Sequence, residues 1–206
     1  MIALIDYKAG NLTSVRKAFA AIRADLYDPG APRDLDRASA IVVPGVGHFG
    51  ATAALDRDWV SAIRAHVAAG RPLLGICLGL QWLFEGSDEA PDSPGLGLLA
   101  GRCYRLGLDG GAAPAIKVPH VGWNSLAMAR SAPIVDAVAP GSQVYFTHSF
   151  VAPVTADTVA VTEHGEPFAA IVQRGRVAGV QFHPEKSGEV GLQILRNFVA
   201  SIGEAA

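Results

Sequence analysis

The sequence predicts an α/β protein with a mostly parallel open sheet, helices on both faces and antiparallel strands in its second half. Half of the 206 residues are hydrophobic and only 17% are charged, which allows a substantial buried core. In the first half, short apolar runs alternate with stretches of helical spacing, a rhythm typical of parallel sheets. The second half instead has short apolar runs separated by turns. The length suits one domain, residues 1–206.

The first half predicts four strands and the helices between them. Asn11 precedes the first helical stretch as an expected cap, and the last strand leads directly into a helix. The apolar, unalternating strands favour a sheet that is covered on both faces. The strands are expected at Ile2–Ile5, Asp25–Tyr27, Ala40–Val43 and Leu73–Ile76, and the helices at Leu12–Ile22, around Trp59 to Val67, and from Leu78 through Phe84.

The second half predicts five short strands and a closing amphipathic helix. Gly175 lies between the last two strands and fits a hairpin turn. Polar or glycine-rich stretches at Gly86–Gly95 and Gly107–Pro114 are expected to be loops. The expected strands are Arg102–Leu106, Gln143–Thr147, Thr158–Thr162, Ala169–Gln173 and Val177–Phe182, and the helix is Gly188–Ile202.

Composition excludes several classes of function. A formal net charge of −2 gives no electrostatic reason to bind nucleic acid or an anionic membrane. The longest apolar run, Leu73 to Phe84, is too short to cross a bilayer. The opening residues have no basic leader, so we expect no signal peptide. Two cysteines are too few for a disulfide framework, and we expect a cytosolic protein with free thiols.

The run around Cys77 is the most informative feature of the chain. Gly75 and Gly79 flank this cysteine at minus two and plus two, between an apolar strand and a helix. Gly-x-Cys-x-Gly is the cysteine form of the nucleophile elbow, a tight strand-to-helix turn that exposes one side chain. A cysteine in an apolar run is more often inert core, and Cys103 is expected to be so because it has no such flanks.

A nucleophilic cysteine needs a base and a group that orients the base. His183 follows an apolar strand, and Glu185 lies two residues further on. Residues two apart on an extended chain project to the same side, so the carboxylate can fix the imidazole. Cys77, His183 and Glu185 are therefore predicted to form a catalytic triad. By itself a His-Pro-Glu sequence is usually a turn, and only its conjunction with the elbow favours catalysis.

Acyl chemistry at a thiolate also needs donors for the developing oxyanion. The backbone amide of Leu78, the residue after the nucleophile, is the first candidate. The glycine-rich loop after the third strand is expected to supply a second amide, from Gly47. Gly45 and Gly47 flank Val46, so this loop could rest with its amide turned away and flip on activation.

These residues resemble the triad, class-I glutamine amidotransferases, whose domains carry Gly-x-Cys-x-Gly-x-Gln and a C-terminal His-Pro-Glu. The resemblance covers nearly the whole chain and implies a flavodoxin-like fold and hydrolysis of L-glutamine to glutamate and ammonia through a cysteine thioester. It also implies that Gln81, with the backbone around His148 and Ser149, binds the glutamine. It implies no cofactor and no metal.

The segment Lys117–Asn124 narrows the resemblance to the glutaminase subunits of imidazole glycerol phosphate synthase, in histidine biosynthesis. Tyr145–Phe150 and the opening Ile2–Tyr7 also fit, whereas Lys8 and His48 stand where small residues are common. The resemblance implies a heterodimer with a cyclase subunit, a barrel that receives the ammonia. The expected partner interface contains Asn11, His120, Trp123 and Lys186.

Three alternatives remain at this stage. The chain could serve another acceptor enzyme such as pyridoxal phosphate synthase, against which the Lys117–Asn124 segment argues. It could be a thiol peptidase or other hydrolase that works alone. It could also be a binding subunit that kept the fold without the chemistry, against which the intact Cys77, His183 and Glu185 argue.

Overall fold

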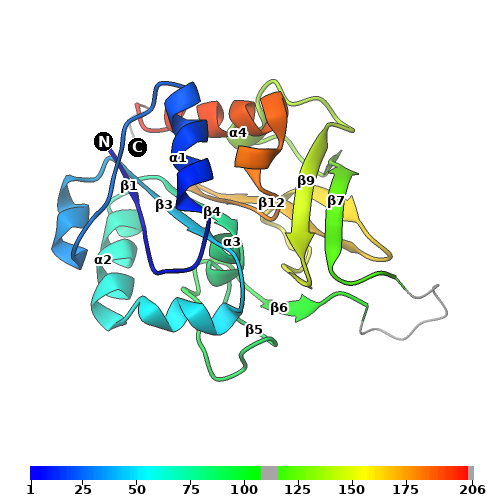
Figure 1. Ribbon diagram of the computed structural model, residues 1–206, viewed down its shortest axis with the longest axis horizontal. Helices are drawn as coiled ribbons and strands as arrows, with labels where there is room; N and C mark the ends of the chain where they lie inside the picture. The colour runs from blue at the N-terminus through cyan, green and yellow to red at the C-terminus, as the bar shows by residue number, and fades with distance from the viewer. Residues whose placement is uncertain (108–115, 204–206) are drawn as a thin grey trace.

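The computed structural model describes residues 1–107 and 116–203 (Figure 1), and its main sheet has eight strands. The strand order is β2-β1-β3-β4-β13-β12-β11-β8. The first five strands in this order are parallel to one another. Beyond β13, each of β12, β11 and β8 pairs antiparallel with the strand before it. The strands are β1 (Ile2–Leu4), β2 (Leu26–Tyr27), β3 (Ala40–Gly45), β4 (Leu73–Cys77), β8 (Ala127–Met128), β11 (Thr158–Glu163), β12 (Pro167–Arg174) and β13 (Val177–Val180).

Helices cover both faces of this sheet because successive strand residues point to opposite sides. On β1, Ile2 and Leu4 join the core beneath α1 (Leu12–Ala21) and α4 (Gly188–Ala200). Ala3 and Ile5 join the opposite core, beneath α2 (Arg57–Ala68) and α3 (Leu78–Trp82). Short 3₁₀ turns complete the helical elements: η1 (Pro32–Arg37), η2 (Phe49–Ala54), η3 (Pro133–Val135) and η4 (Pro184–Lys186).

Two smaller sheets lie outside the main one. The first contains β5 (Gly86–Ser87), β6 (Arg102–Arg105) and β10 (Phe150–Val151). The second is an antiparallel pair of β7 (His120–Ser125) and β9 (Gln143–His148), which we call the β7–β9 ribbon. In Figure 1 the ribbon stands on the side away from α2, beside the orange stretch that leads into α4.

The predicted fold class is confirmed, with differences at the element boundaries. β3 was expected to end at Val43 but continues through Pro44 to Gly45, because it remains paired with β4 as far as Cys77. Asn11 caps α1, its side-chain oxygen accepting from the amide of Ser14 at 3.3 Å. The expected loop Gly107–Pro114 lies outside the described residues beyond Gly107.

Some elements were not predicted. The segment at β7 was interpreted as a partner surface and not as a strand, and β5 lies inside an expected loop. These strands are short or pair far along the chain, so local sequence gives them little signal. Across residues 1–107 and 116–203, no helix is long and apolar enough to cross a membrane.

Candidate active site

Cys77 ends β4 in a strained turn. Its φ is 53°, in the left-handed region that a non-glycine residue adopts at a cost. The turn is held by close packing of α3 on the sheet: a Cβ on Gly79 would lie 1.8 Å from the carbonyl oxygen of Val43. Only glycine fits there, so the second elbow glycine is required by the approach of α3 to β3. Strained backbone that the surrounding packing holds in place is typical of functional sites, which points to a function for Cys77.

His183 and Glu185 meet in a buried pair beyond the end of β13. The imidazole Nδ1 lies 2.8 Å from Oε1 of Glu185, and both side chains are almost fully buried. Burial disfavours the charged ring, but Cys77 and Glu185 outweigh it and raise the pKa of His183 well above its ordinary value. The Nε2 atom has no other hydrogen-bond partner among the described residues and is left for the proton of Cys77. A carboxylate on Nδ1 with a thiol near Nε2 suits general base and acid chemistry.

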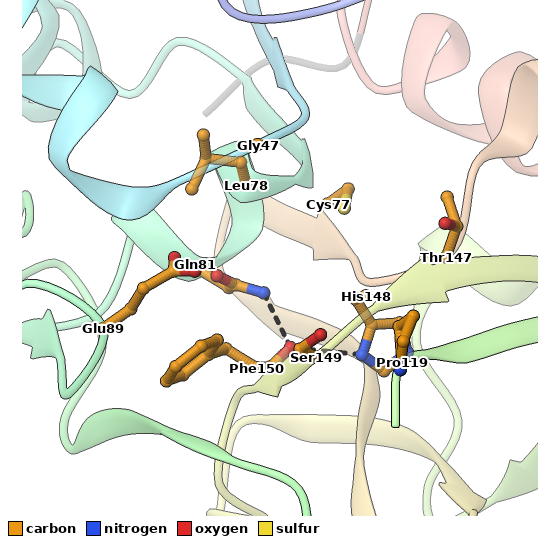
Figure 2. Close-up of a pocket in the computed structure, with 10 residues that line it drawn as sticks. All are labelled: Gly47, Cys77, Leu78, Gln81, Glu89, Pro119, Thr147, His148, Ser149 and Phe150. Carbon is orange, nitrogen blue, oxygen red and sulfur yellow. Dashed lines mark hydrogen bonds between the residues drawn. The ribbon is translucent and has the colours of Figure 1, made fainter. Parts of the chain in front are cut away.

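The Cys77 side chain opens into a cavity of about 290 Å³ (Figure 2). Its lining combines the elbow, the loop after β3 and the chain segment that links β9 to β10. The volume suits a small polar molecule. The lining residues are Gly47, Cys77, Leu78, Gln81, Glu89, Pro119, Thr147, His148, Ser149 and Phe150.

Gln81 is fixed inside this cavity by two hydrogen bonds. Its Nε2 donates to the carbonyl of Phe150 at 2.8 Å, drawn in Figure 2, and to Oε1 of Gln181 at 3.2 Å. Gln181 in turn places its Nε2 3.7 Å from the sulfur of Cys77. The sequence pointed to Gln81 but not to Gln181. The local sequence around His183 could not reveal Gln181, because the contact of Gln181 with Cys77 spans more than a hundred residues.

Glu89 is the second residue of the cavity that the sequence did not reveal. It lies in the expected loop Gly86–Gly95, yet its side chain lines the cavity (Figure 2). Its Oε2 accepts a hydrogen bond from the amide of Phe49 at 2.7 Å, which anchors the carboxylate. An acidic side chain at a cavity wall favours a ligand with an ammonium group. Its sequence signal is weak, because loops on protein surfaces are commonly acidic.

The two expected oxyanion donors border the cavity. Leu78 begins α3 directly after Cys77, and Gly47 lies beyond the end of β3 with a φ of 104°. β3 and β4 pair in parallel with Gly45 opposite Cys77, which brings the glycine loop to the elbow. The sheet therefore brings both backbone segments to the cavity that Cys77 lines, and their role as oxyanion donors stays a prediction.

The residues expected to meet a partner fall into two groups. Trp123 is 57% exposed on β7 and contacts Tyr145 edge-on, with 6.1 Å between ring centres. Lys186 is exposed, and its ammonium lies 5.6 Å from the centre of the same Tyr145 ring. Asn11 is also exposed. His120, by contrast, is buried beneath this surface, because on β7 it faces the interior while its neighbours face outward.

Among residues 1–107 and 116–203, no three His, Cys, Asp or Glu side chains lie close enough together to hold a metal ion. Both cysteines are free and buried. Burial raises the pKa of the Cys103 thiol, so it stays protonated, as expected for an inert core thiol. Cys77 is the thiol that lines the cavity.

A cysteine on a strained elbow beside a His–Glu pair, at the carboxyl ends of a parallel sheet, is the arrangement typical of enzymes that transfer acyl groups through a thioester. The family model for class-I glutamine amidotransferases matches residues 4–202, and the chain belongs to that family. Among its relatives, imidazole glycerol phosphate synthase subunit HisH of Bacillus cereus (strain B4264) is 42% identical over 96% of this chain and 93% of the relative. The proteins of the same name from Methanothermobacter thermautotrophicus and Thermosynechococcus vestitus are 42% and 45% identical, each over 98% of this chain and over 99% and 97% of the relative.

Solved structures share the fold at lower identity. One described as a glutamine amidotransferase superimposes with a TM-score of 0.75 at 18% identity, covering 99% of this chain and all of the other. PurLQS from Thermotoga maritima gives a TM-score of 0.73 at 20% identity, covering 97% of both chains. These comparisons support the architecture, and the closer relatives carry the argument about function.

Proposed function

We propose that this chain is the glutaminase subunit of an imidazole glycerol phosphate synthase, acting in histidine biosynthesis. It hydrolyses L-glutamine and passes the ammonia to a cyclase subunit. The observation that carries the proposal is the strained Cys77 beside the buried His183–Glu185 pair, over a cavity that contains both an anchored carboxylate and an anchored amide. The relatives named as subunits of that synthase support the choice of acceptor.

Glutamine binding uses the two ends of the cavity. The carboxylate of Glu89 attracts the α-ammonium of glutamine, and Phe49 holds that carboxylate in place. Gln81 and the backbone at Ser149 hold the rest of the amino-acid end, and His148 shapes this wall. The side-chain amide of glutamine then lies at the sulfur of Cys77.

The reaction proceeds in two halves. The proton of Cys77 passes first to His183, whose pKa is raised, and the resulting thiolate attacks the amide carbon while the amides of Leu78 and Gly47 stabilise the oxyanion. Collapse breaks the C–N bond as His183 returns the proton to the leaving nitrogen, which releases ammonia and leaves a thioester. Water, deprotonated by His183, then attacks the thioester and releases glutamate and the thiol. Losing one oxyanion donor would slow such a step roughly 10²–10³-fold.

Ammonia must reach its acceptor before water protonates it, so we propose direct docking of the cyclase barrel as a heterodimer. The exposed Trp123, Asn11 and Lys186 form the proposed docking surface, together with Tyr145 between Trp123 and Lys186. Exposed aromatic residues with an adjacent cation are typical of interface centres. The two free thiols suit the reducing cytosol, where we place the enzyme.

Cys77→Ala tests the chemistry directly. In complex with a cyclase barrel, the variant should lose glutamine-dependent synthesis by at least about 10⁴-fold and keep synthesis from added ammonium salt, because only the nucleophile is gone. Cys103→Ala is the matched control and should keep glutamine-dependent synthesis. Residual glutamine-dependent turnover in Cys77→Ala near the wild-type rate would refute the assignment. Loss of both reactions would mean that Cys77 supports the structure of the complex.

A further inference from the structure

A chain of hydrogen bonds runs from the β7–β9 ribbon to the wall of the cavity. Nδ2 of Asn124 lies 3.2 Å from Nε2 of His120, and Nδ1 of His120 lies 3.1 Å from Nε2 of His148. Nδ1 of His148 then lies 3.1 Å from the carbonyl oxygen of Phe150, the second contact drawn in Figure 2. The chain thus joins the strand that exposes Trp123 to the cavity opposite Cys77.

Only one arrangement of protons satisfies this chain with neutral rings. The Phe150 carbonyl can only accept, so Nδ1 of His148 carries the proton and its Nε2 accepts. Nδ1 of His120 must then donate, which leaves Nε2 of His120 as the acceptor for the amide of Asn124. Asn124 uses its other proton on the Glu163 carbonyl at 2.9 Å, and its oxygen accepts from the amide of Ser125. Each ring is therefore held in its Nδ1–H form.

The surroundings keep both rings neutral. Burial lowers the pKa of His148 to about 3 and that of His120 to about 4. His120 lies between the rings of Phe146 and His164, with centre-to-centre distances of 4.8 and 4.2 Å. A second proton on His148 would point at the donating Nδ1 of His120, and a second proton on His120 would point at the donating amide of Asn124. The chain is consequently a fixed polar connection in an otherwise apolar packing.

The hydrogen-bond chain ends at a carbonyl that also contacts Gln81. The carbonyl of Phe150 accepts from His148 and from Gln81 together, so it is held between two donors. Gln81 continues through Gln181 to the sulfur of Cys77. A change in the Phe150 carbonyl therefore moves the group proposed to hold glutamine.

We propose that His120 and His148 are positioning residues, which orient the Phe150 carbonyl and through it Gln81 for glutamine binding. This assigns His148 a role through the backbone and no direct contact with the substrate, and it gives the buried His120 a role behind the docking surface. The inference rests on the proposed glutaminase function for its kinetic consequence, whereas the proton arrangement follows from the geometry alone.

The proton arrangement is tested by nitrogen NMR of the full chain with ¹⁵N-labelled histidine at pH 7. We expect both rings to show a protonated Nδ1 and an unprotonated Nε2, with signals assigned through His120→Asn and His148→Asn. A proton on Nε2 of either ring, or a doubly protonated ring, would overturn the proposal. This measurement needs no enzyme activity and no partner.

Kinetics in the complex with a cyclase barrel test the role. His148→Phe keeps the ring and removes both nitrogens, and we expect the KM for glutamine to rise about tenfold with kcat within about twofold. His148→Asn places an amide donor near the position of Nδ1, so it should restore most of the lost affinity. The corresponding variants of the other histidine in the hydrogen-bond chain are His120→Phe and His120→Asn. They should show a smaller rise in the KM for glutamine and the same recovery with asparagine.

His164→Phe is the matched control. The ring of His164 stacks on His120 but is not part of the hydrogen-bond chain, and its Nε2 lies 2.8 Å from the carbonyl of Lys117. It should leave the KM unchanged. An unchanged KM in His148→Phe, or equal effects of Phe and Asn, would refute the positioning role in an active enzyme. Absence of glutaminase activity in the wild-type complex would instead refute the proposed function and leave the NMR result to decide the proton arrangement.

Discussion

The elbow on β4 and the β7–β9 ribbon are built in opposite ways. β4 lies between β3 and β13, all five of its residues are buried, and it ends in the strained Cys77. The ribbon contains only two strands, and burial alternates along both of them. It exposes Val121 and Trp123 to more than half of their full surface.

The difference shows which part of the fold can hold a strained reactive residue and which part can present a recognition surface. Strain at a nucleophile persists only where packing on every side maintains it, and the centre of a parallel sheet provides that packing. Recognition needs exposed apolar surface, which only a peripheral element can offer. The ribbon remains linked to the catalytic centre by polar contacts: the amide of His183 donates to the Tyr145 carbonyl at 2.9 Å, and the hydroxyl of Ser187 accepts from the Tyr145 amide at 3.0 Å.

Gly79→Ala should have the largest effect, because it forces a Cβ against the Val43 carbonyl in the centre of the sheet. We expect a loss of more than about 4 kcal/mol in the free energy of unfolding, measured by urea denaturation. Gly122→Ala in the ribbon is the comparison, since a Cβ there meets nothing within 4 Å and only the φ of 133° opposes it. It should cost about 1–3 kcal/mol. Equal losses would mean that the elbow is no more tightly packed than the ribbon.

Trp123→Ala should weaken binding to the cyclase barrel by at least about 30-fold, the effect of losing an aromatic residue from the centre of an interface. Titration calorimetry measures the Kd. Labelling of Cys77 by a glutamine-like electrophile in the free chain should stay unchanged, because Trp123 is exposed on the ribbon. Val154→Ala, another exposed apolar side chain outside the ribbon, is the control and should not change the Kd. An unchanged Kd in Trp123→Ala would place the docking surface elsewhere.

His66→Gln should have the smallest effect and tests a buried histidine remote from both regions. Burial lowers the pKa of His66 to about 4, while its ordinary value is 6.5. As the pH falls from about 6.5 to 4, the unfolded chain binds a proton that the folded chain does not, so stability is lost in this window. Glutamine keeps a donor for the Pro72 carbonyl, which lies 3.1 Å from Nε2 of His66, and removes this proton.

The slope of unfolding free energy against pH should therefore fall by about 1.4 kcal/mol per pH unit in that window. Urea denaturation at a series of pH values measures it. Above pH 7 the difference between variant and wild type should be constant, which serves as the internal control. A slope identical to that of the wild type would show that His66 takes up its proton in the folded state.

The sequence predicted the strand, the turn and the His–Glu spacing of the candidate site because each of these is encoded by residues close together in the chain. The alternation of β1, α1 and the following strands, the glycines around Cys77 and the two-residue spacing of His183 and Glu185 all lie within short windows. The predicted fold class and family resemblance are confirmed. The positions of the site residues agree with a triad, whose chemistry remains a proposal.

The sequence did not reveal the residues whose role depends on distant neighbours. Glu89 belongs to a polar loop, and in the folded chain it lines the cavity with its carboxylate held by the amide of Phe49. Gln181 looks like an ordinary residue at a strand end, and His120 was expected at the surface. Burial of His120 follows from the register of β7 against β9, where it pairs with His148. A shift of that register by one residue would have turned it outward.

By itself, then, the sequence determined the sheet and the turn that presents Cys77, and it predicted the nucleophile and its base, since hydrophobic periodicity and glycine spacing act over a few residues. The tertiary structure alone decided what surrounds Cys77: the carboxylate of Glu89, the amide of Gln181 and the histidine chain from the ribbon. These groups come together through strand pairing and loop packing between segments far apart in the chain. No local pattern encodes such contacts, because each depends on how the whole core closes.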